Sequence, residues 1–245
     1  MAVSDHELAA ALAQETGTRL LAVRTSGLEG RALAKEGDRV AQEFLATELA
    51  AARPGDFVLS EEGADDLSRL IAQRVWIIDP LDGTREYSEG RDDWAVHVAL
   101  WEDGDLTAGA VAVPTRELVL STAEPQALST EPVGPLRVAV SRTRPPAKAQ
   151  RLVEKVGAEL VPMGSAGYKT AAVVLGEVDA YLHAGGQYEW DSAAPAVVAW
   201  TSGLSATRLD GSPLRYNYPD ALLPDFLVAR PEVARSIVEV IAKGH

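Results

Sequence analysis

The feature that most constrains this chain is an apolar run that ends in two acids. Residues 74–84 read RVWIIDPLDGT, and Asp79 and Asp82 come directly after the run, on either side of Pro80 and Leu81. A short apolar run of this kind predicts a buried strand. Proline fixes one backbone angle and the glycine that follows permits a left-handed conformation, so a turn here can aim both carboxylates at one point. The sequence therefore predicts a strand whose tip presents two carboxylates, with the Leu81 carbonyl between them.

The segments around this motif predict two helices and several strands in the first half of the chain. Leu and Ala recur at helical spacing over residues 5–23, where Ser4 is the expected N-cap, and again over residues 37–52. Strands are predicted at residues 56–60, 74–79, 93–101, 107–114 and 117–123. We expect these strands to pair antiparallel.

Strands and helices alternate in the second half of the chain. Strands are predicted at residues 136–141, 158–164, 178–184, 205–209 and 226–230, and helices at residues 147–157, 165–176, 191–203 and 231–244. Alternation of this kind favours an α/β layer with a sheet covered on both faces. The pattern changes around residues 132–135, so we expect an α+β subdomain at residues 1–134 and an α/β subdomain at residues 135–245.

Composition limits the classes of function that this chain can have. Its 245 residues carry a net charge of −13, which disfavours nonspecific binding to nucleic acid or to a membrane surface. The first residues lack a basic segment followed by an apolar one, and no apolar run reaches the ~18–20 residues that span a bilayer, so we expect a cytoplasmic protein. There is no cysteine, so a bound metal must be held by oxygen or imidazole.

More acids stand near the ends of other predicted elements. Glu61 and Glu62 follow the strand at residues 56–60, and Asp191 precedes an Ala-rich helix. Each has an ordinary explanation by itself, as a surface loop or a helix N-cap. Together with the pair in residues 74–84, they indicate strand ends that face one cleft. Such a cleft suits Mg²⁺, which prefers carboxylate and carbonyl oxygens, and bound cations would offset the repulsion of an anionic substrate.

A competing interpretation treats the first aspartate as a nucleophile. Haloacid-dehalogenase-type phosphatases use a D-x-D-G-T motif in which the first Asp is phosphorylated. Here two residues separate Asp79 from Asp82, and the motif follows two predicted helices. This spacing argues against a covalent aspartyl-phosphate mechanism.

The acids in their order along the chain resemble a known family of phosphatases. The matching residues are Glu61-Glu62, Asp79-Pro80-Leu81-Asp82-Gly83-Thr84 and Trp190-Asp191. This pattern is similar to the inositol monophosphatase superfamily, whose members are Mg²⁺-dependent and often lithium-sensitive phosphomonoesterases, and the similarity runs from about residue 5 to residue 230. It implies a layered αβαβα fold like that of the sugar phosphatases, with two sheets sandwiched by helices. Homodimers are common in the superfamily, although no stripe in this sequence specifies such an interface.

Three segments look most like the CysQ branch of this superfamily: DPLDGTREY, EWDSAAPA and LDGSPLRYN. This branch comprises 3′(2′),5′-bisphosphate nucleotidases that hydrolyse 3′-phosphoadenosine 5′-phosphate (PAP). The resemblance therefore implies the release of phosphate from a small phosphorylated substrate by attack of water, in the context of sulfate assimilation.

The resemblance also assigns metal ligands by position, and it implies two to three Mg²⁺ ions. Glu61, Asp79 and the Leu81 carbonyl match the ligands of the first metal. Asp79, Asp82 and Asp191 match the ligands of the second. Glu61, through water, is associated with a third.

Catalytic roles carry over in the same way. Thr84 matches the threonine that helps to activate the attacking water, and Asp38 matches its acidic partner, although a helix N-cap is the ordinary role for this residue. Glu61 is a further candidate to accept or orient the proton. Asp82, Gly83, Thr84 and Asp191 are expected to surround the reacting phosphate.

The segment MGSAGYK matches a second glycine turn of the family. Gly164 and Ser165 would present a backbone N–H group and a hydroxyl at a helix N-terminus, which is a natural anion site. Lys169, one turn into the helix, is expected to reach a phosphate or a ribose hydroxyl. Three arginines, Arg142, Arg144 and Arg215, are weaker candidates for a second phosphate, and His183 is a candidate substrate contact.

Two alternatives stay open at this point. One is the same metal chemistry on inositol 1-phosphate or fructose 1,6-bisphosphate. Inositol phosphatases carry an acid about seven positions before the W-D aspartate, and residues 182–188 contain none, which weakens the inositol interpretation. The other alternative is a catalytically silent module that binds a metal or a nucleotide, against which the complete set of ligand types and Thr84 argue.

Overall fold

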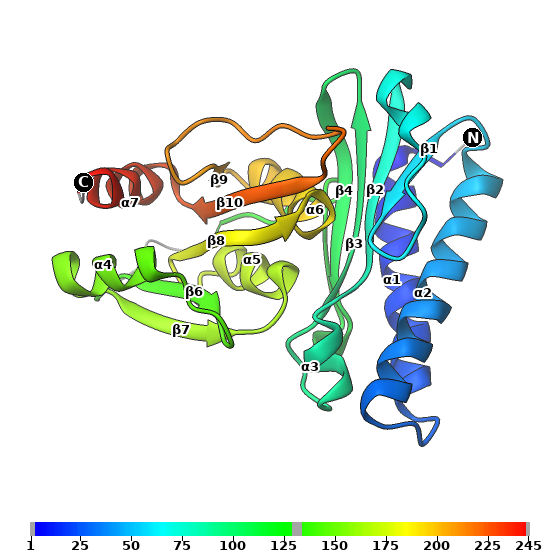
Figure 1. Cartoon of the computed structure of the whole chain (residues 1–245), viewed down its shortest axis with the longest axis horizontal. Helices are drawn as coiled ribbons and strands as arrows, with labels where there is room; N and C mark the ends of the chain where they lie inside the picture. The colour runs from blue at the N-terminus through cyan, green and yellow to red at the C-terminus, as the bar shows by residue number, and fades with distance from the viewer. Residues whose placement is uncertain (1–2, 129–133, 244–245) are drawn as a thin grey trace.

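The computed structural model of the chain describes residues 3–128 and 134–243. Two five-stranded sheets and three layers of helices make up these residues (Figure 1). Helices α1 (Asp5–Arg24) and α2 (Gly30–Ala52) cover the outer face of the first sheet. Helices α5 (Ala166–Val174) and α6 (Glu189–Thr201) lie between the sheets, and α4 (Ala147–Val156) and α7 (Pro231–Ala242) cover the outer face of the second. The expected αβαβα layering is therefore confirmed.

The first sheet has the order β1-β2-β3-β4-β5. Its strands are β1 (Phe57–Ser60), β2 (Arg74–Asp82), β3 (Ala95–Glu102), β4 (Asp105–Val113) and β5 (Leu118–Ser121). Strands β1 and β2 pair in parallel, which corrects the expectation of antiparallel pairing, and the other neighbours are antiparallel. Trp76 and Ile78 pack towards α1 and α2, whereas Ile77 packs towards the middle helices. Strand β2 is apolar without alternation because both of its faces are buried.

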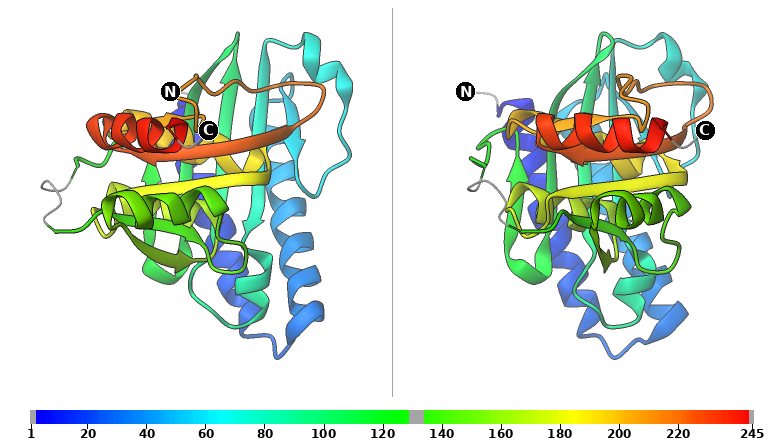
Figure 2. Two further views of the ribbon diagram at one scale, coloured as in Figure 1. Left: turned by 60° about the vertical axis from the view of Figure 1, so that its left-hand side comes forward. Right: turned by 90° about the vertical axis from the view of Figure 1, so that its left-hand side faces the viewer.

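The second sheet has the order β7-β6-β8-β10-β9. Its strands are β6 (Arg137–Ser141), β7 (Glu159–Met163), β8 (Ala180–Tyr188), β9 (Ser205–Thr207) and β10 (Leu222–Ala229). Strand β6 pairs in parallel with β7 and β8, and β10 pairs antiparallel with β8 and β9. The strands of this sheet run across those of the first sheet, as the views in Figures 1 and 2 show.

The two outer helices of the first layer begin differently from each other. Helix α1 begins where predicted, because the Ser4 hydroxyl accepts a hydrogen bond from the Glu7 N–H group and the Glu7 carboxylate accepts one from the Ser4 N–H group. Helix α2 begins at Gly30, although the sequence predicted residue 37. Gly37 is a packing position within the helix, since a Cβ atom there would lie 2.9 Å from the ring of Tyr87. Asp38 is therefore not the helix N-cap.

Three short helical segments, which the sequence pattern does not predict, complete the described residues. They are the 3₁₀ turns η1 (Leu67–Ile71) and η2 (Pro114–Arg116) and the short helix α3 (Thr84–Ser88). Helix α3 follows the acidic motif directly. No helix in the described ranges has the length and apolar character needed to cross a membrane.

The two sheets are built from separate stretches of chain. The first sheet uses residues between 57 and 121, and the second uses residues between 137 and 229. The change of pattern predicted at residues 132–135 falls partly on residues 129–133, which lie outside the described residues. A subdomain boundary near residue 134 stays a prediction. The largest hydrophobic cluster joins Ile77 and Val111 of the first sheet to Tyr181 and Phe226 of the second, so both halves share a core.

Candidate active site

The parallel pairing of β1 with β2 brings the first acids together. Ser60 is the register partner of Ile78, so the next residues, Glu61 and Asp79, leave the same edge of the sheet. The carboxyl ends of parallel strands are a common place for functional residues. This arrangement explains why acids follow two separate apolar segments of the sequence.

An irregularity at the end of β2 lets both of its aspartates face the same region. Asp79 pairs with His97 of β3 and Asp82 pairs with Ala95, so the register shifts between the two aspartates. Gly83 follows with a φ of 90°, a left-handed conformation that favours glycine, and α3 begins at the next residue. The backbone N–H group of Leu81 donates to Asp79 at 3.1 Å. The predicted turn is therefore a bulged strand end followed by a left-handed glycine.

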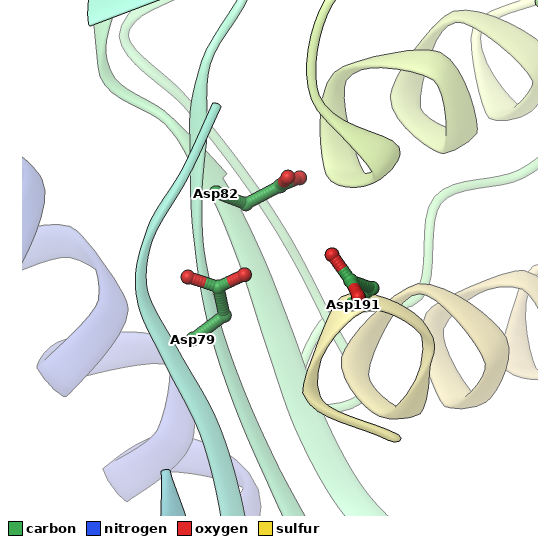
Figure 3. A group of neighbouring side chains, drawn as sticks. All are labelled: Asp79, Asp82 and Asp191. Atoms are coloured by element: carbon green, nitrogen blue, oxygen red, sulfur yellow. The ribbon is translucent and has the colours of Figure 1, made fainter. Parts of the chain in front are cut away.

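Helix α6 brings a third aspartate to this point from the other half of the chain. Asp79, Asp82 and Asp191 each offer one carboxylate oxygen, and these three oxygens lie within 4.8 Å of one another (Figure 3). Asp191 is not the N-cap, because α6 begins at Glu189. Its carboxylate accepts a hydrogen bond of 2.7 Å from the N–H group of Tyr188, which fixes it at the first turn of the helix.

The protein itself binds one oxygen of Asp82 tightly. Its Oδ2 atom accepts hydrogen bonds from the Ser165 hydroxyl and, at 2.8 Å, from the Gly167 N–H group, and it lies 3.1 Å from His97 Nε2. The N-terminus of α5 therefore binds an internal carboxylate, although the sequence predicted an anion from the substrate there. The Gly164 N–H group is also in use, since it donates to Asp93 Oδ2 at 2.7 Å.

His97 is a part of the site that the sequence analysis missed. The side chain is fully buried, and its Nδ1 atom lies 3.0 Å from the backbone carbonyl of Trp190. Its two ring nitrogens thus connect Asp82 on the first sheet to the residue before Asp191 on α6. The sequence showed only a histidine in an alternating strand, because the partner residues are 15 and 93 positions away.

Lys169 is more enclosed than the sequence predicted. Its ammonium group is buried, donates to the carbonyl of Gly164 at 2.9 Å and to that of Ser165, and lies 4.9 Å from the centre of the Tyr181 ring. Burial lowers the pKa of Lys169 to about 8. Two of its three N–H bonds therefore stabilise the glycine turn itself.

Burial and mutual repulsion shift the acids of the cluster. Burial first, and then the charges of Glu61 and Asp82, raise the pKa of Asp79 well above its ordinary value. Burial and repulsion between carboxylates also raise the pKa of Glu61 and of Asp191 to about 7. Burial alone would raise the pKa of Asp82, but His97, Lys169 and the Ser165 hydroxyl lower it to about 2.

The donor set fits a hard divalent cation. It consists of carboxylate oxygens, which Mg²⁺ and similar ions prefer. Crowded carboxylates whose pKa values rise are also the groups that a bound cation would stabilise in the ionised form. Glu61 and Leu81 line the same pocket, so the Glu61 carboxylate and the Leu81 carbonyl are the candidates to complete the set. Which cation is bound, and by which of these atoms, stays a proposal.

Thr84 and Asp38 meet beside this cluster. The Thr84 hydroxyl donates to the Leu81 carbonyl at 3.0 Å and lies 3.5 Å from Asp38 Oδ1. Burial and the charge of Glu62 raise the pKa of Asp38 to about 6. The Thr84 hydroxyl and the Asp38 carboxylate are thus close enough to interact, as the resemblance implies. The catalytic roles of both residues remain predictions.

A pocket of about 480 Å³ opens in front of the cluster. Ten of the residues predicted for the site line it: Glu61, Asp79, Leu81, Asp82, Gly83, Thr84, Gly164, Ser165, Lys169 and Asp191. Asp38 lies outside this lining and reaches it through Thr84. Of the weaker candidates, Arg144 and His183 line the pocket, whereas Arg142 and Arg215 do not.

Comparison with known proteins identifies the family of the chain. The model of the inositol monophosphatase family matches residues 2–242. The chain belongs to this family. It is 51% identical to the 3′-phosphoadenosine 5′-phosphate phosphatase of Mycobacterium leprae, over 98% of this chain and 94% of that protein. It is 28% identical to the 3′(2′),5′-bisphosphate nucleotidase CysQ of Escherichia coli, over 78% of this chain and 83% of that protein.

The fold of this inositol monophosphatase family member agrees with solved structures. The structure of inositol monophosphatase II from Staphylococcus aureus superposes on this chain with a TM-score of 0.81 and 22% sequence identity. The match covers 97% of this chain and 93% of that one. The family that the sequence motifs indicated is therefore confirmed, together with its layered fold. Members of this family are metal-dependent, which agrees with the acidic cluster at the tip of β2.

Proposed function

We propose that this inositol monophosphatase family member hydrolyses the 3′-phosphate of PAP to give AMP and phosphate, as a 3′(2′),5′-bisphosphate nucleotidase. The substrate is supported by the relative from Mycobacterium leprae, which is 51% identical over 98% of this chain. The chemistry is supported by the three carboxylates that meet within 4.8 Å in a pocket. The carboxylate cluster carries the proposal, because it indicates metal-dependent phosphate hydrolysis from residues of this chain itself.

The proposed cofactor is Mg²⁺, as two to three ions held by Asp79, Asp82, Asp191, Glu61 and the Leu81 carbonyl. When bound, such ions supply positive charge that polarises phosphoryl oxygens and lowers the pKa of water. The protein contributes the geometry. Asp82 has its Oδ2 atom held by α5 and His97, so the side chain is already fixed and would lose little freedom when a cation binds.

Thr84 and Asp38 are proposed to handle the proton of the attacking water. The Thr84 oxygen can accept a hydrogen bond from water while its own proton is directed to an acceptor. Asp38 Oδ1 lies 3.5 Å from the Thr84 hydroxyl, whose proton would turn from the Leu81 carbonyl to Asp38. The pKa of Asp38, about 6, leaves it mostly ionised at neutral pH, as a general base requires. Direct attack by water then needs no phosphorylated aspartate. Glu61, with a pKa of about 7, is a second candidate for the same role.

The wider context follows from the same proposal. Hydrolysis of PAP would place the enzyme in sulfate assimilation, acting on a small phosphorylated substrate in the cytoplasm. Sensitivity to lithium and assembly as a homodimer are further proposals that rest on the resemblance to the family. Gel filtration with light scattering would test the homodimer.

A phosphate-release assay on three substrates tests the function. PAP, fructose 1,6-bisphosphate and inositol 1-phosphate are compared with Mg²⁺, with a chelator in its place, and with added Li⁺. We expect kcat/KM for PAP to be at least about tenfold above the other two, as one well-placed contact can supply. A higher value for either of the others would reassign the substrate. Tight binding of PAP without phosphate release would instead indicate a silent binding module.

A further inference from the structure

The second sheet and the turn after β6 line one wall of the pocket with an arginine and a histidine. Strand β6 pairs in parallel with β8, with Ala139 opposite Tyr181, and this register brings the end of β6 beside His183. Arg144 lies in the turn after β6, where its backbone N–H group donates to the Ser141 hydroxyl at 3.3 Å. Both Arg144 and His183 line the pocket. Burial and the nearby charges of Lys169 and Arg144 lower the pKa of His183, which agrees with this placement.

The structure sorts the three arginines that the sequence named as candidates for a second phosphate. The Arg142 guanidinium donates to Glu86 at 2.9 Å and to Glu89 at 2.8 Å, so two carboxylates already occupy it. Arg215 does not line the pocket. Arg144 does, and its guanidinium makes no hydrogen bond or ion pair with residues 3–128 or 134–243. In a chain with a net charge of −13, an arginine that faces a pocket without a carboxylate partner is available to a ligand anion.

A buried amide lies on the same wall. Gln187 is 5% exposed and lines the pocket, and its Nε2 group donates to the Tyr181 hydroxyl at 2.8 Å. Its Oε1 atom is buried without a hydrogen-bond partner in the part of the chain that the structure describes. Buried polar groups without a partner are rare in folded proteins. Gln187 and His183 lie on the same strand, β8, and both line the pocket together with Asp191 and Arg144, so one ligand can contact Gln187 as well as the acids.

We propose that Arg144 binds the phosphate that is not hydrolysed, and that Gln187 binds a polar group of the nucleoside between the two phosphates. The inference rests on the proposed function, because it needs a substrate with two phosphates. An arginine suits this task, since its planar guanidinium forms two parallel hydrogen bonds to phosphate oxygens. Arg144 is exposed at the pocket mouth, so binding the second phosphate there does not require a charged pair to be fully desolvated.

Steady-state kinetics with PAP and 3′-AMP separate this role from a general effect. We expect R144A to lower kcat/KM for PAP by about tenfold to hundredfold, mainly through KM, because the contact is made equally before and during the reaction. The loss with 3′-AMP, which has no second phosphate, should be much smaller. R144K should lie in between, since it keeps the charge without the planar geometry. The control is R215A, which removes the same charge from an exposed arginine outside the pocket.

Gln187 gives a contrasting pattern. Because its proposed contact is to the nucleoside, Q187L should reduce kcat/KM for PAP and for 3′-AMP alike, by about fivefold to fiftyfold.

Arg85 also lines the pocket, next to Thr84, and is the alternative residue to bind the second phosphate. If R85A removes the preference for PAP over 3′-AMP and R144A does not, the assignment to Arg144 is wrong.

Binding measurements distinguish this inference from the proposed function. Calorimetry with AMP and adenosine compares ligands that differ only in the 5′-phosphate. We expect the wild-type protein to bind AMP more tightly than adenosine and R144A to bind both with similar affinity. A preference for AMP that survives in R144A would overturn the inference even if PAP is hydrolysed. If PAP is not hydrolysed but the preference for AMP depends on Arg144, the subsite stands and the proposed reaction fails.

Discussion

The first and second sheets contribute to the pocket in different ways. The first sheet supplies acids from a strand that is packed on both faces, and Asp79 at its tip is only 1% exposed. The second sheet supplies Arg144 from an exposed turn and His183 from a half-buried position. The crowded acids need a rigid support, because their repulsion would otherwise move them apart. A single cation that binds the outer part of a substrate has no like charge crowded against it. It therefore needs no rigid support and can lie in an exposed turn, as Arg144 does.

Replacement of Asp79 should have the largest effect. Asp79→Asn keeps the shape of the side chain and removes one of the three carboxylates that offer oxygens within 4.8 Å of one another. We expect kcat/KM to fall by about 10³-fold or more at any Mg²⁺ concentration, since charge stabilisation by bound metal contributes several kcal/mol. Phosphate release measures this loss. A rate near that of the wild type would show that the site is elsewhere.

The same variant tests the claim that the acids repel one another. In a chelator, Asp79→Asn should melt at or above the temperature of the wild-type protein, because Glu61 and Asp82 disfavour the charge of Asp79. Asp105→Asn, at the exposed start of β4, is the matched control and should change neither activity nor melting. A large loss of stability in Asp79→Asn would mean that the carboxylate has a structural role that repulsion does not describe.

Arg69 tests the connection between the two halves of the chain. Its guanidinium is fully buried, donates to Asp65 at 2.6 Å and to Asn217 Oδ1 at 2.6 Å, and also reaches the carbonyl of Tyr218 at 2.9 Å. The N–H groups of Asn217 and Tyr218 in turn donate to the carboxylate of Glu189, at the start of α6. Arg69 therefore supports the helix that carries the third aspartate of the cluster.

Arg69→Ala should lower the free energy of unfolding by about 3 kcal/mol, because it leaves buried acceptors without a donor. Urea denaturation measures the change. Arg39→Ala is the control, since Arg39 pairs with Glu36 and Glu43 on the surface and its loss should amount to less than about 1 kcal/mol. Equal losses in the two variants would argue against a special role for the buried guanidinium.

The pH dependence of stability should reflect the raised pKa values of the acids in the cluster. Glu61 and Asp191 have pKa values of about 7 in the folded protein, above their ordinary values of 4.5 and 3.8. At low pH these acids are protonated in both states, and the folded state has its full stability. As pH rises towards the folded pKa, ionisation favours the unfolded state, so this stability is lost. Without cations, stability should therefore fall by about 2 kcal/mol in total from about pH 4 to about pH 7, after allowance for solvent screening.

Thermal melts in a chelator and in Mg²⁺ check this linkage. A bound cation favours the ionised acids, so the stabilisation by Mg²⁺ should increase as pH rises over the same range. Asp82 has the opposite sign, because its pKa is lowered to about 2, and its contribution is lost only in strong acid. If stability in the chelator is constant or rises between pH 4 and pH 7, the pKa values of these acids are not raised as described.

Features that depend on local pattern could be predicted from the sequence. The apolar runs gave the strands, the Ser4 capping box gave the start of α1, and the order of the acids gave the family. The predicted start of α2 was wrong because Gly37-Asp38 has the local pattern of a helix start. In the structure, Gly37 lies inside the helix and allows close packing against Tyr87. Local sequence does not distinguish a glycine at the start of a helix from one inside a helix that makes room for a neighbouring ring.

Features that depend on contacts between distant segments could not be predicted. The helix N-terminus at Ser165 has the local pattern of a substrate site, but Asp82, 83 positions away, occupies it. His97 and Arg69 acquire their roles in the same way, from partners on the other half of the chain. The choice of Arg144 over Arg142 also required the structure, because only the fold shows that Glu86 and Glu89 bind Arg142.

Replacement of Glu62, at the edge of the first sheet, should have the smallest effect. Its charge helps to raise the pKa of Asp38 to about 6, after burial as the larger cause. Because Asp38 is proposed to act in its ionised form, kcat/KM should fall as pH drops below its pKa. Glu62→Gln removes the repulsion, so the acid limb of the profile should move to lower pH by less than about one unit.

The pH profile of kcat/KM for PAP measures this shift, with Glu43→Gln as the matched control. Glu43 lies near Asp38 in the same surface depression, but its charge is paired with Arg39, whereas the charge that raises the pKa of Asp38 is that of Glu62. A shift of the same size in both variants would indicate a general effect of surface charge. If Glu62→Gln leaves the limb in place and Glu61→Gln moves it, the proton goes to Glu61, and the role proposed for Asp38 with Thr84 is wrong.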